Sequence, residues 1–398
     1  MTRPSPAERR CLTWMCVLIG VNQLGFGAIV PVLPLYAQAF GVTVSAVGMA
    51  VAIYGLARFL IAMPIGRLSD ALGRRTALAL GGLLSAAGNI WCAWAADFPE
   101  FVIARFIAGA GAGAIITTGH VVLADITRPE WRGRAIGIYQ GTFIFSVGIG
   151  PFPGGWLAEN WGLDTPFIAC GLASLIAGAI AWFAVGETRD LASDGKGHAP
   201  SPDFLRQLRL VLSNGPILLA SWITFINAFS RTGGLFTIVP ILGASSLALG
   251  ADEIGFGIAL GSVLGLLAAW PAGMLADRFG RKTVIVPATA VSGGAMLLFA
   301  LAPTYFWFAA ACALWSVATS VGGAAPAAYA ADNAPAGMNA TAMSSYRMIG
   351  DAGYVLGPIL LGFVVDAGGE HAALYLASGL LVAATLAFAG FARESHRL

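Results

Sequence analysis

Twelve apolar runs of membrane-spanning length limit what this chain can fold into more than any other feature. A transmembrane helix needs about 20 consecutive, mostly apolar residues. The runs cover residues 11–36, 44–65, 76–96, 99–123, 134–157, 165–186, 214–241, 253–274, 282–302, 304–328, 340–364 and 371–391. Only 11% of the residues are charged, compared with about 25% in soluble domains. We therefore predict an all-α integral membrane protein.

An internal repeat relates the two halves of the chain. The sequence GRLSDALGRR at 66–75 returns as GMLADRFGRK at 273–282, 207 residues further on. The same spacing relates Asp125 to Asp332, Tyr139 to Tyr346, and Gly150 to Gly357. A repeat half as long as the chain indicates a duplicated domain rather than a solenoid of short repeats.

The distribution of positive charge predicts how the spans are oriented. Nineteen of the 22 Lys and Arg residues fall in segments that an alternating topology places on one side, together with both termini. Cytoplasmic loops are the ones enriched in Lys and Arg, so we predict cytoplasmic termini in a bacterial inner membrane. The expected parts are a tail at 1–10, a bundle at 11–186, a cytoplasmic linker at 187–212, a bundle at 213–391 and a tail at 392–398.

The repeated loop resembles that of the major facilitator superfamily, in which the loop between the second and third helices reads G-x-x-x-D-[RK]-x-G-[RK]-[RK]. The second copy matches throughout, whereas Ala71 replaces a basic residue in the first copy. The matching residues are Gly66, Asp70, Gly73, Arg74 and Arg75, and then Gly273, Asp277, Arg278, Gly280, Arg281 and Lys282. The resemblance covers essentially the whole chain and implies two pseudo-symmetric six-helix bundles.

The resemblance also implies a mechanical role for this loop. A carboxylate at the end of one helix can accept hydrogen bonds from the N-terminus of a neighbouring helix. By resemblance, Asp70 meets the start of the eleventh helix and Asp277 the start of the fifth, forming a cytoplasmic latch that breaks when the transporter opens inward. The alternative is that the charges of the loop only anchor the topology.

A glycine- and proline-rich motif in the fifth span resembles the GP-x-x-GG motif of proton-coupled drug antiporters. It consists of Gly150, Pro151, Gly154 and Gly155, preceded by Gly137. Proline kinks a helix, and small residues let a facing helix approach closely. Generic packing of small residues is the alternative interpretation.

Four charged side chains lie well inside predicted spans: Arg58, Arg105, Arg231 and Asp351. Each needs an explanation, because an ionised side chain at the bilayer centre costs about 2.5–3.5 kcal/mol. We hypothesise that Asp351 forms a cluster with Arg58 and with Arg347, one helical turn away, and that it loads and releases a proton. A permanently ionised structural salt bridge is the alternative.

The other interior polar residues carry weaker predictions. Arg105 resembles the arginine of the family's R-x-x-Q-G motif, which implies a part in proton movement; it could instead stabilise backbone carbonyl groups. Arg231 could attract an anionic group into a cavity or serve as a packing partner between helices. Further candidates for lining the substrate cavity are Asn22, Gln23, Tyr54, Tyr139, Gln140, Asn227 and Tyr346.

These observations predict a secondary active transporter that exports small amphipathic or drug-like compounds in exchange for protons, by alternating access. The alternative is a transporter, possibly a symporter, for an anionic or zwitterionic metabolite, because the first span contains no acid and the interior charges are mostly positive. We expect a monomer with substrate, protons and lipid as partners. We expect neither enzyme activity nor a cofactor, metal or nucleic-acid partner.

Overall fold

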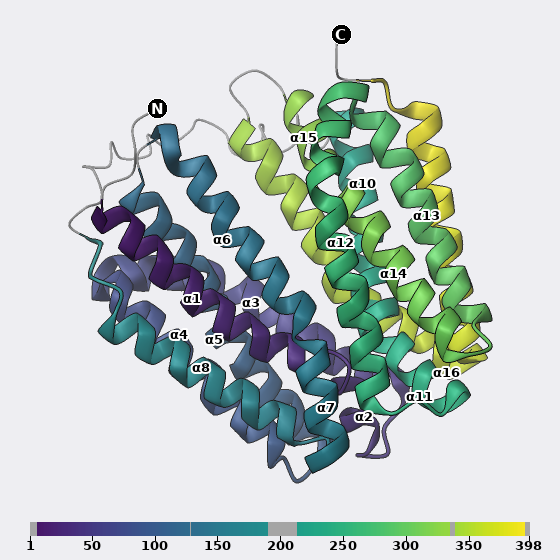
Figure 1. Cartoon of the computed structure of the whole chain (residues 1–398), viewed down its shortest axis with the longest axis horizontal. Coiled ribbons are helices and arrows are strands. Elements are labelled where there is room, and N and C mark those ends of the chain that lie inside the picture. The colour runs from purple at the N-terminus through teal and green to yellow at the C-terminus, as the bar shows by residue number, and fades with distance from the viewer. Residues whose placement is uncertain (1–5, 128, 190–212, 335–338, 395–398) are drawn as a thin grey trace. The chain divides into compact units, whose positions relative to one another are not determined.

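The computed structural model describes residues 6–127, 129–189, 213–334 and 339–394. Within these residues the regular elements are all helical (Figure 1). Eleven stretches of the described chain are long and apolar enough to cross a membrane, and the last of them, Ala342–Phe391, contains two of the predicted spans. The predicted all-α membrane fold is therefore confirmed. Most of the predicted linker lies outside the described residues.

The first compact unit comprises Met1–Phe40 and Ile53–His198. Its helices are α1 (Pro6–Ile29), α2 (Leu33–Gln38), most of α3 (Val44–Leu72), α4 (Arg74–Ala93), α5 (Phe98–Ile126), α6 (Pro129–Ile149), α7 (Pro151–Trp161) and α8 (Thr165–Phe183). Helix α1 packs against α6 and α8, and α4 packs against α5 and α8. The core of this unit gathers buried side chains of α1, α4, α5, α6 and α8.

The second unit comprises Gly41–Ala52 and Ala199–Leu398. Its helices are α10 (Gly215–Phe229), the π-helix η2 (Ser230–Ile238), α11 (Val239–Leu247), α12 (Ala251–Phe279), α13 (Arg281–Leu301), α14 (Tyr305–Gly322), α15 (Ala325–Asp332) and α16 (Asn339–Phe391). Helix α16 packs along α10 and α13, and α14 packs along α12 and α13.

The first turns of α3 belong to the second unit because they are bonded to α16. The backbone N–H groups of Val44 and Ser45 donate to the carboxylate of Asp366, at 2.8 and 3.0 Å. One turn further along, Gly48 lies so close to the carbonyl of Pro358 that a side chain there would overlap it. The sequence analysis placed these residues in the first bundle, and the domain bounds given there stay a prediction.

Two pairs of glycines with positive φ repeat the same turns in both units. Gly73 and Gly280 separate the helices of the repeated loop, with φ of 94° and 99°. Gly162 and Gly369, also 207 residues apart, have φ of 107° and 82°. Glycine adopts such angles without steric cost. The break at Gly369 divides α16 into the last two predicted spans.

The second unit departs from the repeat at the counterparts of α5 and α1, among other places. Helix α5 runs unbroken from Phe98 to Ile126, whereas its counterpart ends as α14 at Gly322 and restarts as α15 at Ala325. The counterpart of α1 is interrupted by the π-helix η2. π-helical segments are rare and occur frequently at functional sites.

Candidate functional site

The first copy of the repeated loop is organised around the guanidinium group of Arg74. Its Nη1 donates to Asp70 on the preceding helix at 2.5 Å, and its Nε donates to Asp125 at the end of α5 at 3.0 Å. The Arg74 side chain is only 7% exposed and that of Asp125 only 11%. This buried cation therefore ties the ends of α3, α4 and α5 together.

A carboxylate that follows the last helix of the unit caps the start of α4. Glu187 accepts hydrogen bonds from the backbone N–H groups of Arg74 and Arg75, at 2.9 and 3.2 Å. A side chain at Gly73 would overlap this carboxylate. Burial alone would raise the pKa of Glu187, but the backbone N–H groups of Arg74, Arg189, Arg75 and Thr188 outweigh that effect and lower it. Glu187 is therefore held ionised at the positive end of the α4 dipole.

The second copy of the loop is capped in the same way. Glu394 accepts from the backbone N–H groups of Arg281 and Lys282, at 2.8 and 3.1 Å, and a side chain at Gly280 would overlap it. Arg281 Nε lies 3.6 Å from Asp332, the counterpart of Asp125. The surroundings of Gly273 and the side chains of Asp277 and Arg278 lie outside what the structure describes.

In the interior of the first unit, Arg105 is the most deeply buried charged side chain among those described, at 1% exposed. Its guanidinium carbon lies 4.3 Å from the centre of the Tyr54 ring, and Tyr54 stacks on Phe26 at 5.2 Å. Within the described chain, Arg105 Nε and Nη1 have no hydrogen-bond partner. The contact with the ring face supplies part of the missing stabilisation.

The remaining polar candidates of the first unit differ in their surroundings. Gln23 donates to Asn22, which donates to Ser174 on α8 at 3.3 Å, so this pair bonds within the bundle. Tyr139 is fully buried in the core, and its hydroxyl has no partner among the described residues. Gln140 is exposed.

Two glycines of the fifth-span motif contact the backbone of α1. Helix α6 ends at Ile149 and α7 begins at Pro151, and Gly150 between them keeps right-handed helical angles. Gly150 lies against Leu24 and Gly154 against Ala28 so closely that a side chain at either would overlap the backbone of α1. Gly155 is also buried, whereas Gly137 is exposed, with nothing near its missing side chain.

In the second unit, three predicted residues line one cavity of about 180 Å³. They are Asn227 on α10, Arg231 at the start of η2, and Tyr346 on α16. The Thr224 hydroxyl donates to the Tyr346 hydroxyl at 2.6 Å. The cavity reaches α13, α14 and the first turn of α15. Polar groups from four helices and the π-helix thus converge inside this bundle.

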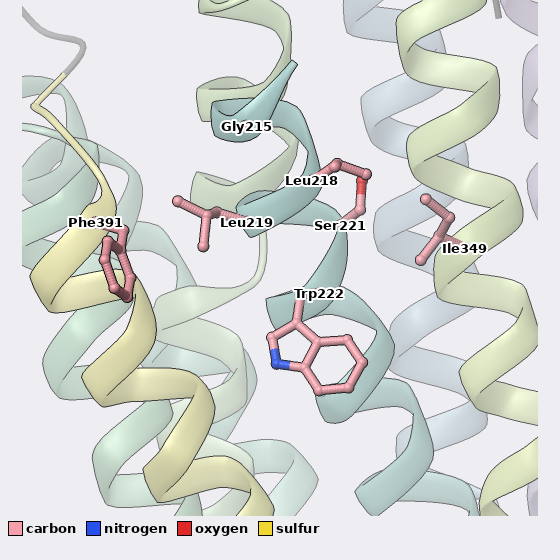
Figure 2. A pocket seen from close by; sticks show the side chains of 7 residues that line it. All are labelled: Gly215, Leu218, Leu219, Ser221, Trp222, Ile349 and Phe391. Atoms are coloured by element: carbon pink, nitrogen blue, oxygen red, sulfur yellow. The ribbon is translucent and has the colours of Figure 1, made fainter. Parts of the chain in front are cut away.

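A larger cavity of about 520 Å³ along α10 is almost purely apolar. Figure 2 shows Phe391 on one side of α10 and Ile349 on the other, with the Trp222 ring below. Its one hydroxyl, that of Ser221, already donates to the Ile217 carbonyl at 2.8 Å. Among the described lining residues, the other polar side-chain group is the indole N–H of Trp222, so this surface mainly suits hydrocarbon.

Asp351 and Arg347 form an i, i+4 ion pair on α16, with 3.8 Å between Nε and Oδ2. Both side chains are more than half exposed, at 54% and 71%. Arg58 is half-buried on the part of α3 that belongs to the first unit. The predicted cluster of these three residues would include both units, and it stays a prediction. The latch contacts predicted for Asp70 and Asp277 join the units in the same way and also stay predictions.

A family model described as Major Facilitator Superfamily matches residues 15–265 and 223–397, and so covers nearly the whole chain. The chain belongs to this superfamily. Membership makes it an integral membrane transporter with a small-molecule substrate rather than an enzyme.

This major facilitator chain has relatives of low sequence identity. It is 24% identical to an uncharacterized MFS-type transporter of Methanocaldococcus jannaschii, over 87% of this chain and 88% of that protein. It is also 24% identical to the quinolone resistance protein NorA of Staphylococcus aureus, over 61% of each chain. The crystal structure of a D-xylose–proton symporter superposes with a TM-score of 0.76 at 16% identity, covering 97% of this chain and 99% of that one.

The sequence analysis missed Glu187 and Glu394, which cap the two loops of this transporter. A signal for them was present, because they are 207 residues apart like the motif itself. It was overlooked because each follows the last apolar run of its bundle, where no spanning helix was expected. Asp125 and Asp332 stand out in the sequence through the repeat, but the sequence alone gives no role for them.

Proposed function

We propose that this transporter exports small amphipathic, drug-like compounds in exchange for protons, by alternating access of a site to the two sides of the membrane. The observation that carries the proposal is the close contact that Gly150 and Gly154, on either side of Pro151, make with the backbone of α1. This motif resembles that of proton-coupled drug antiporters. The similarity to a quinolone resistance protein supports the same substrate class.

The proton gradient is a sufficient energy source for such export. One charge moving through 100 mV supplies about 2.3 kcal/mol, enough to sustain roughly a fifty-fold gradient of an uncharged solute. Asp351 is our candidate for the proton carrier, because it is the only acid well inside a predicted span. We assign Arg105 and Arg58 supporting roles as the other interior cations of that pathway.

We further propose that both termini face the cytoplasm of a bacterial inner membrane, and that the protein acts as a monomer. The one-sided distribution of Lys and Arg supports the orientation. In this orientation the capped loops of Arg74 and Arg281 face the cytoplasm, where Asp70 and Asp277 would form the latch. Labelling of single cysteines placed near Glu187 and near Asp97 should show the two positions on opposite sides.

The proposal is tested with purified protein in liposomes under an imposed pH gradient. A quinolone and a neutral amphipathic compound should accumulate against their gradients on the side that supplies the protons. No movement of any compound, with or without a gradient, would contradict the proposal.

A second candidate, a symporter for an anionic metabolite, is favoured by the presence of Arg231 in the cavity of the second unit. The same liposomes separate the two candidates. In a symporter, solute and protons move in the same direction, so an anionic metabolite would accumulate on the side opposite to the proton source.

A further inference from the structure

The cavity in the second unit occupies a position that is solid core in the first unit. The repeat spacing of 207 residues relates the cavity-lining glycines Gly322 and Gly323 to Ile115 and Ile116 of α5. Both isoleucines are buried in the core of the first unit, at 1% and 8% exposed. Loss of two large side chains from one helical turn therefore accounts for the opening.

The residues around this opening are also more polar than their counterparts. Thr289 stands where the first unit has Gly82, and Thr319 where it has Ala112. Thr289 is only 4% exposed and lines the cavity from α13. Its hydroxyl can donate a hydrogen bond to a bound group, whereas Gly82 has no side chain that could do so.

The helix break at Gly322 places the start of α15 beside the same cavity. Helix α15 begins at Ala325, no side chain caps it, and Pro326 in its first turn lines the cavity. The first N–H groups of a helix lack internal partners, and its N-terminus carries partial positive charge. Broken helices of transporters point such N-termini at anionic groups of their substrates.

The side chains that line the cavity also favour an anionic group. Arg231 contributes a guanidinium group, and none of the fifteen described lining residues is Asp or Glu. Because Tyr346 accepts a hydrogen bond from Thr224, its own O–H remains able to donate. A guanidinium group, two hydroxyl groups and a helix N-terminus together favour an anionic ligand with several acceptor oxygens.

We propose that this cavity binds the carboxylate group of the transported amphipathic compound, with Arg231, Tyr346 and Thr289 as its ligands. The inference rests on the proposed function and specifies its substrate class. A volume of about 180 Å³ suits a carboxylate with the ring that bears it, and leaves the rest of the molecule outside.

The experiment compares a quinolone carboxylic acid with its methyl ester, which has nearly the same shape but no negative charge. Transport of both is measured in liposomes for the wild type, Arg231→Gln, Arg231→Lys and Thr289→Val, with Arg10→Gln as a control for the loss of an exposed arginine. We expect Arg231→Gln to reduce kcat/KM for the acid about tenfold or more, the worth of one charge-assisted contact. For the methyl ester, the same substitution should change kcat/KM by less than about twofold.

Partial recovery in Arg231→Lys and an acid-specific loss in Thr289→Val are also expected. Equal effects on acid and ester, or no effect on either, would overturn the assignment. If the wild type transports neither compound, the export proposal fails, and binding of the acid to the detergent-solubilised protein then tests the site by itself. In that binding measurement, absence of binding, or binding that Arg231→Gln does not weaken, would overturn the proposed carboxylate site.

A refilled cavity gives an independent check. Gly322→Ile restores the residue of the first unit, and Gly294→Ile is the matched control, because a side chain at Gly294 meets nothing within 4 Å. The first variant should lose the preference for the acid and the second should keep it, provided that both elute as monodisperse protein. Retained preference in a folded Gly322→Ile variant would contradict the proposed location.

Discussion

Replacing Arg74 with glutamine should destabilise the first unit far more than the same change at the neighbouring Arg75. Arg74 is buried and bonded to Asp70 and Asp125. Removing one partner of a buried ion pair costs about 3–5 kcal/mol, because the other charge is left uncompensated. Asp70 is 70% exposed and can be hydrated instead, whereas Asp125 cannot. We therefore expect the lower end of the range, about 3 kcal/mol.

Arg75 makes a weaker contact, with its guanidinium carbon 4.5 Å from the centre of the Trp182 ring. Such cation–π contacts are worth about 0.5–1 kcal/mol at accessible sites. The two variants should thus differ by about 2 kcal/mol. For a unit of this size, that corresponds to a difference of roughly 4–8 °C in melting temperature.

The assay is thermal unfolding of the detergent-solubilised protein, followed by tryptophan fluorescence. In the double variant Arg74→Gln, Asp125→Asn, no uncompensated carboxylate is left at position 125. We expect it to recover at least about half of the stability lost in Arg74→Gln, because substitutions at residues in contact are not additive. Equal melting temperatures for Arg74→Gln and Arg75→Gln, or no recovery in the double variant, would refute the reasoning.

Two further predictions concern the capping carboxylates. Because the pKa of Glu187 is lowered from its ordinary value of 4.5, its cap stabilises the fold fully above that value, and the stabilisation is lost as the pH falls through the lowered pKa. Glu187→Gln should abolish this acid-dependent part of the melting curve, whereas Glu370→Gln should preserve it. Gly280→Ala should lower the melting temperature because it combines a strained φ, worth about 1–3 kcal/mol, with overlap of Glu394. Gly66→Ala, where a side chain meets nothing within 4 Å, is its control and should melt like the wild type.

The helices were predictable because lipid leaves a spanning segment little choice. Each backbone N–H and C=O must be bonded within the segment, so a long apolar run becomes a helix. The ends were less predictable: α3 continues past the predicted residue 65 to Leu72 and stops only where Gly73 adopts a positive φ. Nothing in the hydrophobic pattern shows that α3 extends beyond its predicted end.

The interruptions of the second unit could not be predicted from hydrophobicity. The π-helix at Ser230–Ile238 is less apolar than α10 and α11 on either side of it, and α15 is less apolar than α14. A more polar stretch inside a predicted span does not by itself indicate a π-helix or a break. Comparison of the halves carries more information, since Gly322 and Gly323 stand where the first half has isoleucines. Those differences, rather than the shared motif, locate the cavity.

The candidate site was predictable only in part. Asn227, Arg231 and Tyr346 do converge on one cavity, whereas Asn22 and Gln23 bond to each other and to Ser174. An isolated polar residue in an apolar run can either line a substrate cavity or bond to a neighbouring helix, because a hydrogen bond within the bundle satisfies it as well as a substrate does. Only the packing of the neighbouring helices separates the two cases.

The most direct test of proton-coupled export is the proton movement that the substrate itself causes. Liposomes containing the purified protein and a trapped pH indicator receive a quinolone on one side, with no gradient imposed. We predict proton movement opposite to the substrate in the wild type and in Glu370→Gln, and its loss in Asp351→Asn, which should still exchange substrate across the membrane. Substrate movement without any proton movement in the wild type, or unchanged coupling in Asp351→Asn, would contradict this account.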